Sequence, residues 1–155
     1  MLFFHVVVAV LALTPQASRA SVPEPTVVFV CEHGAAKSVI ATAYFNKIAA
    51  ERGLRARAIY RGTNPQADLS VRTVQGLKDD GLPVPSEQPS AITSADVEAA
   101  TVIFAIGCSL PANASASGKS ANWDDVPDDQ GYGAQRDAIK KHVESLVEDL
   151  LKRQR

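Results

Sequence analysis

Hydrophobic and polar positions follow one another along this chain in a pattern that predicts strands separated by helices. Residues 27–30 and 101–107 are apolar at nearly every position, which is typical of parallel strands buried on both faces. Residues 54–60 alternate more weakly and predict a further strand. Because parallel strands need crossover helices, and those helices cover the sheet, the pattern predicts an α/β domain.

Apolar residues spaced three and four apart predict the helices. They fall at four places: residues 38–52, from Ser70 to Gly81, 96–100 and 135–152. Asp68 or Ser70 can cap the second helix, and Ser94 can cap the third. Residues 83–89 hold three prolines and residues 111–122 are small and polar, so both segments are expected to be exposed loops.

The first twenty residues have the layout of a secretory signal peptide. Residues 2–13 are almost continuously apolar, Pro15 breaks the run, and small residues stand at Ser18 and Ala20. The run is too short to span a membrane as a helix. We expect cleavage after Ala20, export to a periplasmic or other extracytosolic space, and a short leader at residues 21–25. The alternative is an apolar strand or helix that belongs to the fold.

Composition narrows the function classes only slightly. The 155 residues, with 46% hydrophobic and 21% charged, are typical of one globular domain, here residues 26–155. A net charge of −1 gives no reason to expect nucleic acid or an anionic membrane as a partner. The two cysteines, Cys31 and Cys108, form no ligand set for zinc, but an oxidising compartment would permit a disulfide between them.

The most informative segment follows the first strand directly. It reads Cys31-Glu32-His33-Gly34-Ala35-Ala36-Lys37-Ser38. A turn of small residues that enters a helix directs its backbone N–H groups and the positive end of the helix dipole to one place, which suits an anion. The same dipoles favour thiolate over thiol, so a reactive cysteine is expected there. The alternative is an inert cysteine of the core.

These residues resemble a known family. A buried strand followed by Cys31-x5-Lys37-Ser38 is similar to the phosphate-binding loop of low-molecular-weight protein tyrosine phosphatases and thioredoxin-type arsenate reductases, which have arginine where Lys37 stands. Residues 123–129 are similar to the acid segment of that family, with Asp128 in the acid position and Asp129 in place of the usual proline. The end of the strand at Cys108 resembles the reductase branch, which carries a resolving cysteine there.

The resemblance implies a fold and a mechanism. The fold would be flavodoxin-like, three layers in the order α/β/α around a four-stranded parallel sheet. Cys31 would attack phosphorus, Asp128 would protonate the leaving group, and Ser38 would donate a hydrogen bond to the thiolate. The phosphate would be bound by the loop residues Glu32, His33, Gly34, Ala35, Ala36, Lys37 and Ser38. The chemistry needs no metal and no cofactor, and Trp123 and Tyr132 could wall the pocket for an aromatic ring.

Three departures from the family pattern predict weaker catalysis. Lys37 supplies a charge but lacks the planar fork with which arginine grips two oxygens. Glu32 puts a negative charge beside the nucleophile. Gly34 replaces an asparagine that usually braces the loop.

Three functions therefore remain open. The first is a weakened phosphomonoesterase that acts on phosphotyrosine or another aryl phosphate. The second is a reductase of arsenate or a similar oxyanion through Cys31 and Cys108, although export does not assure a supply of reducing thiols. The third is a non-catalytic domain that binds an oxyanion. Cys108 can also be a structural cysteine and Asp128 a helix cap, while His33 is expected in the loop and His142 on the exposed side of the last helix.

Overall fold

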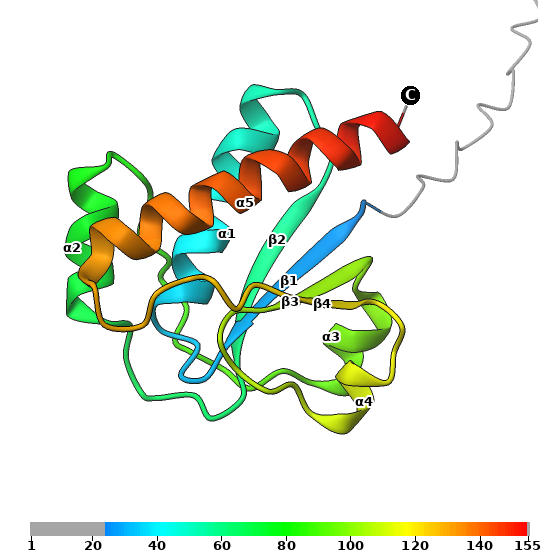
Figure 1. Cartoon of the computed structure of the whole chain (residues 1–155), viewed down its shortest axis with the longest axis horizontal. Helices are drawn as coiled ribbons and strands as arrows, with labels where there is room; N and C mark the ends of the chain where they lie inside the picture. Colours follow the sequence, from blue (N-terminus) through cyan, green and yellow to red (C-terminus); the bar gives the residue numbers. More distant parts are fainter. Residues whose placement is uncertain (1–23, 155) are drawn as a thin grey trace, which may run out of the picture.

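The computed structural model describes residues 24–154, so the predicted signal peptide and most of the leader lie outside the described part of the chain. Its centre is a four-stranded parallel sheet in the order β2-β1-β3-β4 (Figure 1). The strands are β1 (Thr26–Cys31), β2 (Arg57–Gly62), β3 (Val102–Ala105) and β4 (Ser120–Asn122). The predicted α/β class is confirmed.

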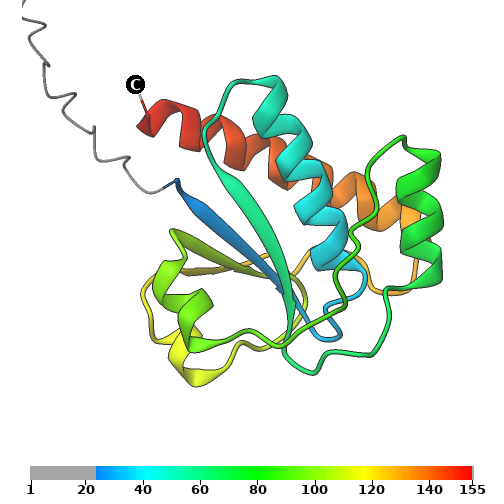
Figure 2. The ribbon, with the colours of Figure 1, turned by 180° about the vertical axis from the view of Figure 1, so that it is seen from behind.

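Helices cover both faces of this sheet. Alternate residues of β1 point to opposite faces: Val27 and Phe29 join the larger core, Val28 and Val30 the smaller one. The larger core is closed by α1 (Lys37–Glu51), α2 (Val71–Asp79) and α5 (Gly131–Arg153), and the smaller by α3 (Ser94–Ala99) and α4 (Ala112–Ser115). Figures 1 and 2 show the three layers from opposite sides.

The element boundaries shift by a few residues from their predicted positions. The second strand runs over residues 57–62 instead of 54–60, because the chain first turns at Gly53 and buries Leu54 against the end of α1. The third helix is capped by Thr93 instead of Ser94, in a reciprocal capping box with Asp96. The last helix begins at Gly131, four residues earlier than expected.

The prediction for residues 111–122 was wrong. Residues 111–122 are not simply an exposed loop, because they contain α4 and the edge strand β4. All three residues of β4 are exposed, and α4 buries only Ala114. Neither element has an apolar periodicity, so hydrophobic patterning carried no signal for them.

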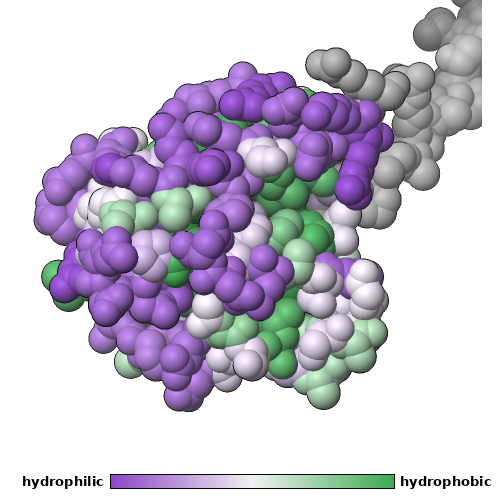
Figure 3. Space-filling model, in the orientation of Figure 1, coloured by the Kyte–Doolittle hydropathy of each residue, from purple (hydrophilic) through white to green (hydrophobic). Residues whose placement is uncertain are grey.

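The surface of the long helix is polar. In the orientation of Figure 1, the upper part of the molecule, where α5 lies, is mostly hydrophilic (Figure 3). Along its inner face α5 buries Ile139, Val143, Val147 and Leu150 against the larger core. Among residues 24–154 no helix is both long and apolar enough to cross a membrane.

Candidate active site

The candidate nucleophile lies at the carboxyl end of the central strand β1. Cys31 is 3% exposed, and its Sγ lies 3.1 Å from the Oγ of Ser38 in the first turn of α1. A hydroxyl at this distance can donate a hydrogen bond to the sulfur when it is a thiolate. The residue that caps α1, Ala36, offers no side chain to its first N–H groups. The start of this 15-residue helix is therefore open toward an anion.

The backbone of the loop is oriented by the segment that joins β2 to α2. Four loop carbonyls accept hydrogen bonds of 2.8–3.2 Å from N–H groups of that segment, in the pairs Cys31–Thr63, Glu32–Asn64, His33–Gln66 and Ala35–Ser70. Within residues 24–154, the N–H groups of residues 33–38 donate to no protein acceptor. Because the carbonyls face the protein, these N–H groups are left for a ligand.

Two glycines allow this arrangement. Gly34 has φ of +61°, and a Cβ built on it would lie 2.9 Å from the backbone N of Gly62, the last residue of β2. A Cβ on Gly62 would in turn lie 2.9 Å from the backbone N of Gly34. A side chain at either position would push the loop away from β2. Gly34 has no side chain with which to brace the loop, but it allows close backbone packing against Gly62.

The loop cation and the candidate acid form an ion pair. Nζ of Lys37 donates a hydrogen bond to Oδ1 of Asp128, which joins the start of α1 to the segment before α5. The side chain of Lys37 is only 10% exposed, whereas that of Asp128 is 74% exposed. Gly107, at φ of +61°, leaves the space for the amine, because a Cβ there would lie 2.6 Å from Nζ.

A partly buried carboxylate that the sequence did not reveal joins the helices around this site. Asp80, at the end of α2, accepts hydrogen bonds from Tyr44 (2.8 Å), Tyr132 (2.6 Å) and Arg136 (3.2 Å). Burial raises the pKa of Asp80, but the hydrogen bonds of the two tyrosines and the charge of Arg136 outweigh it, so the net pKa lies below its usual value. Burial and the contact with Asp80 raise the pKa of Tyr44 to about 12. In the sequence, Asp79-Asp80-Gly81 indicates only the end of a helix, so nothing there pointed to the role of Asp80.

The two aromatic residues expected to wall the pocket lie in different places. Tyr132 lines a cleft between the start of α1, α2 and α5 together with Asp128, and its ring packs where a side chain on Gly76 would otherwise lie. Trp123 is instead buried in the core, with its ring 4.6 Å from that of Phe104, so this expectation was wrong.

His142 also lies elsewhere than expected. Its ring stacks on Trp123 at 4.7 Å and contacts the carboxylate of Asp125 at 2.7 Å, so it does not lie on the exposed side of α5. His33 is an exposed loop residue whose Nδ1 lies 3.3 Å from the carbonyl oxygen of Asn64, and Glu32 is exposed beside it.

Cys108 lies half-buried just beyond β3, beside the end of β1. Its Sγ is 3.5 Å from the carbonyl oxygen of Val30, the residue before Cys31. Burial raises the pKa of the Cys108 thiol, and the nearby Cys31 adds to the rise when it is ionised. Both cysteines are free thiols. In the described part of the chain, no group of three or more His, Cys, Asp or Glu residues could hold a metal ion.

Comparisons with solved structures find the same fold. YfkJ from Bacillus subtilis superposes with a TM-score of 0.73 at 20% identity, covering 89% of this chain and all of the other. The thioredoxin-dependent arsenate reductase Cg_ArsC1' from Corynebacterium glutamicum gives a TM-score of 0.69 at 18% identity, covering 86% of this chain and 65% of the other. A low molecular weight phosphotyrosine phosphatase from Vibrio cholerae O395 gives 0.68 at 18% identity, covering 83% and 98%.

A search of curated proteins finds no match. At the level of sequence, a model of one family, described as "Low molecular weight phosphotyrosine protein phosphatase", matches residues 26–155. This match spans the strand, the cysteine loop and the acid segment that carried the resemblance. The chain belongs to the low molecular weight phosphotyrosine protein phosphatase family.

Proposed function

We propose that the protein is a phosphomonoesterase that acts on aryl phosphates through a cysteinyl-phosphate intermediate. The observation that carries the proposal is the buried sulfur of Cys31, 3.1 Å from the hydroxyl of Ser38, under a loop in which four carbonyls bond to the neighbouring segment of the protein. Free N–H groups around a nucleophile suit the oxygens of a phosphoryl group, which gather charge during transfer.

In the first step the thiolate of Cys31 attacks phosphorus, and the bond from phosphorus to the phenolic oxygen breaks. The leaving phenolate takes its proton from Asp128. In the second step water attacks the phosphocysteine, Asp128 accepts a proton from that water, and the thiolate leaves with a hydrogen bond from Ser38. The products are a phenol and inorganic phosphate, so atoms and charge balance.

The ion pair between Lys37 and Asp128 gives a reason for weak activity. A carboxylate that accepts from an ammonium group is ionised and has no proton to give. A bound phosphate must therefore compete with Asp128 for Lys37. An arginine could hold two phosphate oxygens at once, whereas Lys37 offers a single point of charge.

A second candidate is the reduction of an oxyanion such as arsenate. It is favoured by the position of Cys108, a free thiol beside the strand that ends in Cys31. Cys31 would bind arsenic, and attack by Cys108 on the sulfur of Cys31 would release arsenite and leave a disulfide. Arsenic gains the two electrons that the sulfurs lose. The raised pKa of Cys108 works against this reaction at neutral pH.

We further propose that residues 1–20 direct export of the protein. The support is the apolar run followed by small residues at Ser18 and Ala20. Mass determination of the protein from its native host should give a chain that begins at Ser21. An intact amino terminus at Met1 would contradict the proposal.

The functional test measures hydrolysis of an aryl phosphate such as 4-nitrophenyl phosphate by the purified protein, with and without a reductant. We expect slow turnover that Cys31→Ser lowers by a factor of about a thousand or more and that Cys108→Ser leaves intact. Asp128→Asn should lower it less for this substrate, because nitrophenolate leaves readily without a proton.

Other outcomes would select another function. Arsenite production that requires Cys108 would favour the reductase. Saturable phosphate binding without turnover, in the wild type and in Lys37→Arg, would identify a domain that binds oxyanions without catalysis.

A further inference from the structure

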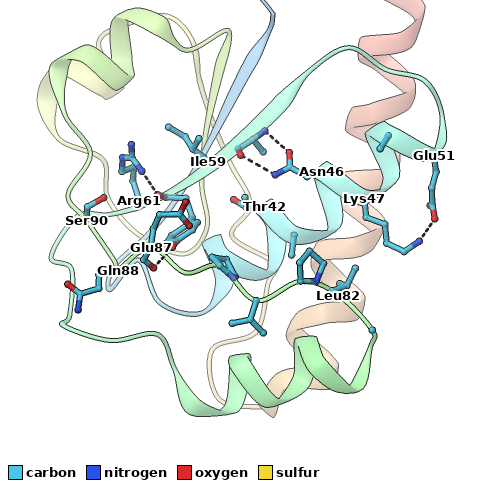
Figure 4. A pocket seen from close by; sticks show the side chains of 18 residues that line it. Thr42, Asn46, Lys47, Glu51, Ile59, Arg61, Leu82, Glu87, Gln88 and Ser90 are labelled. Carbon is cyan, nitrogen blue, oxygen red and sulfur yellow. Dashed lines mark hydrogen bonds and ion pairs between the residues drawn. The ribbon is translucent and has the colours of Figure 1, made fainter.

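A second cavity lies away from the cysteine loop, at the edge of the sheet. It has a volume of about 940 Å³, is open to solvent, and is lined by α1, the edge strand β2 and residues 81–90 (Figure 4). None of residues 31–38 and no part of the acid segment lines it. Its size is that of a site for a small molecule.

The walls are mostly apolar. They include Ala43, Ala50, Leu82, Val84 and two prolines, Pro83 and Pro85. The segment that carries the prolines is tied to the strand by the hydroxyl of Tyr60, which donates to the carbonyl of Glu87 over 2.6 Å. Burial raises the pKa of this tyrosine, which keeps the hydroxyl protonated as a donor.

One buried polar side chain in this cavity lacks a partner among the described residues. The hydroxyl of Thr42 is buried, with only 6% of the residue exposed, and its Oγ1 makes no hydrogen bond to any described residue. An unpaired buried hydroxyl is costly, so it is expected to meet a ligand atom or water. Thr42 lies on α1 and lines the cavity (Figure 4).

Most backbone groups on the free edge of β2 are already hydrogen-bonded. Its even-numbered residues direct their backbone groups away from β1, because the odd-numbered Arg57 and Thr63 bond toward that strand. The side chain of Asn46 bonds to both backbone groups of Ala58. Its Oδ1 accepts from the N–H over 2.8 Å, and its Nδ2 donates to the carbonyl oxygen over 3.2 Å. The N–H of Gly62 donates to the carbonyl of Ser90 over 2.8 Å, and the carbonyl of Gly62 accepts from the N–H of Ile92 over 3.1 Å.

Tyr60 lies between Ala58 and Gly62 on this edge and provides the one free donor. Its carbonyl accepts from Arg61 over 2.9 Å, while its N–H has no acceptor among the described residues. An extended peptide therefore cannot add along this edge, since every backbone group but one is taken. The occupant must be compact.

The charges at the rim indicate a neutral occupant. Lys47 pairs with Glu51, and Arg61 pairs with Asp96 through two hydrogen bonds of 2.9 and 3.0 Å. No cation of the lining is thus left for an anion, and Glu87 adds an exposed negative charge to the rim.

We propose that this cavity binds a small, mostly apolar and uncharged molecule that carries one carbonyl group. The carbonyl oxygen accepts hydrogen bonds from the hydroxyl of Thr42 and the N–H of Tyr60, and the apolar part of the molecule packs against Leu82, Val84 and the prolines. The site is independent of Cys31 and of the proposed phosphatase activity.

The test is a titration of the ¹⁵N-labelled full chain with acetanilide, an aromatic ring with one neutral amide, followed by NMR of the amide groups. We expect saturable shifts at Tyr60 and in residues 81–90, with residues 32–38 unmoved. Benzoate, which is anionic, should bind about tenfold more weakly or not at all.

Two variants make the test specific. Thr42→Val keeps the shape of the side chain, removes an unpaired hydroxyl and should weaken acetanilide binding about fivefold or more. Ala50→Phe fills the cavity from an exposed position of α1 and should abolish binding, whereas Ala99→Phe, at an exposed position of α3 outside the cavity, should not. No saturable shift, shifts confined to residues 32–38, or an unchanged affinity in Thr42→Val would each overturn the proposal.

Discussion

The cysteine loop and the acid segment meet at the same site but are held in different ways. Four backbone hydrogen bonds and the contact between Gly34 and Gly62 fix the loop, and its cysteine is buried. Asp128 is largely exposed and is held by its ion pair with Lys37 and by a 2.9 Å bond from Gln135 to its carbonyl. The loop is thus held by backbone contacts, whereas the carboxylate of Asp128 is exposed to solvent and is held by one ion pair. Binding and protonation should be separable by mutation.

The largest loss of stability should follow from a side chain placed where the cysteine loop packs against β2. Gly34→Ala forces a side chain into a left-handed backbone conformation and against the backbone of Gly62. We expect the free energy of unfolding to fall by about 2–4 kcal/mol, together with loss of phosphate binding. Denaturant titration measures the first, and isothermal calorimetry with inorganic phosphate the second.

Gly53→Ala is the matched control, because Gly53 has φ of +69° but no atom within 4 Å of its added Cβ. It should lose only the cost of the backbone conformation, about 1 kcal/mol. Equal losses in both variants would show that packing against Gly62 does not matter.

A smaller effect is expected from the carboxylate behind the acid segment. Asp80→Asn should lower the free energy of unfolding by about 1–3 kcal/mol, since two tyrosines and Arg136 lose a charged acceptor. Because the pKa of Asp80 is lowered in the folded protein, its contribution is complete above the pKa of the unfolded chain and is lost as pH falls through the folded value.

Denaturation of both proteins between about pH 3 and pH 7 tests this. The difference between the wild type and Asp80→Asn should be constant near neutrality and shrink toward pH 3. A difference that grows on acidification would contradict the assigned role of Asp80.

The loop cation should have a moderate effect on turnover. Lys37→Arg introduces the fork that grips two phosphate oxygens, and we expect kcat/KM for an aryl phosphate to rise about tenfold. Steady-state kinetics measure it. The double change Lys37→Arg with Cys31→Ser is the control and should remain inactive.

The smallest effect, on phosphate affinity, should come from Asp128, the exposed partner of Lys37. Asp128→Asn removes the charge that competes with phosphate, so the Kd for inorganic phosphate should fall about threefold, or about 0.7 kcal/mol. The free energy of unfolding should change by less than about 1 kcal/mol, because the carboxylate is exposed. Weaker phosphate binding in Asp128→Asn would show that the ion pair does not oppose the ligand.

The sequence predicted the cysteine loop better than the acid segment. The apolar strand, the cysteine and the small-residue turn are local features, and the resemblance to the family implied the contact between Ser38 and Cys31. The partnership of Lys37 with Asp128 joins residues far apart in the chain, and hydrophobic patterning says nothing about such pairs.

Other misses have a similar cause. Aromatic residues occur both in pocket walls and in hydrophobic cores, so the sequence did not distinguish the two for Trp123. The packing of Phe29, Phe104 and His142 around its ring places it in the core. Asp80 gives no signal, because three separate helices must meet before its partners exist. Hydrophobic patterning did not predict the strand β4, because this strand is short and all of its residues are exposed.

The central claim is that Cys31 carries the phosphoryl group during turnover. The most direct measurement is rapid acid quenching of the protein during hydrolysis of an aryl phosphate, followed by mass spectrometry of the peptide that contains Cys31. The account predicts one added phosphoryl group on Cys31, absent when substrate is omitted and absent in Cys31→Ser. Hydrolysis that proceeds in Cys31→Ser, or a phosphoryl group found on another residue, would contradict it.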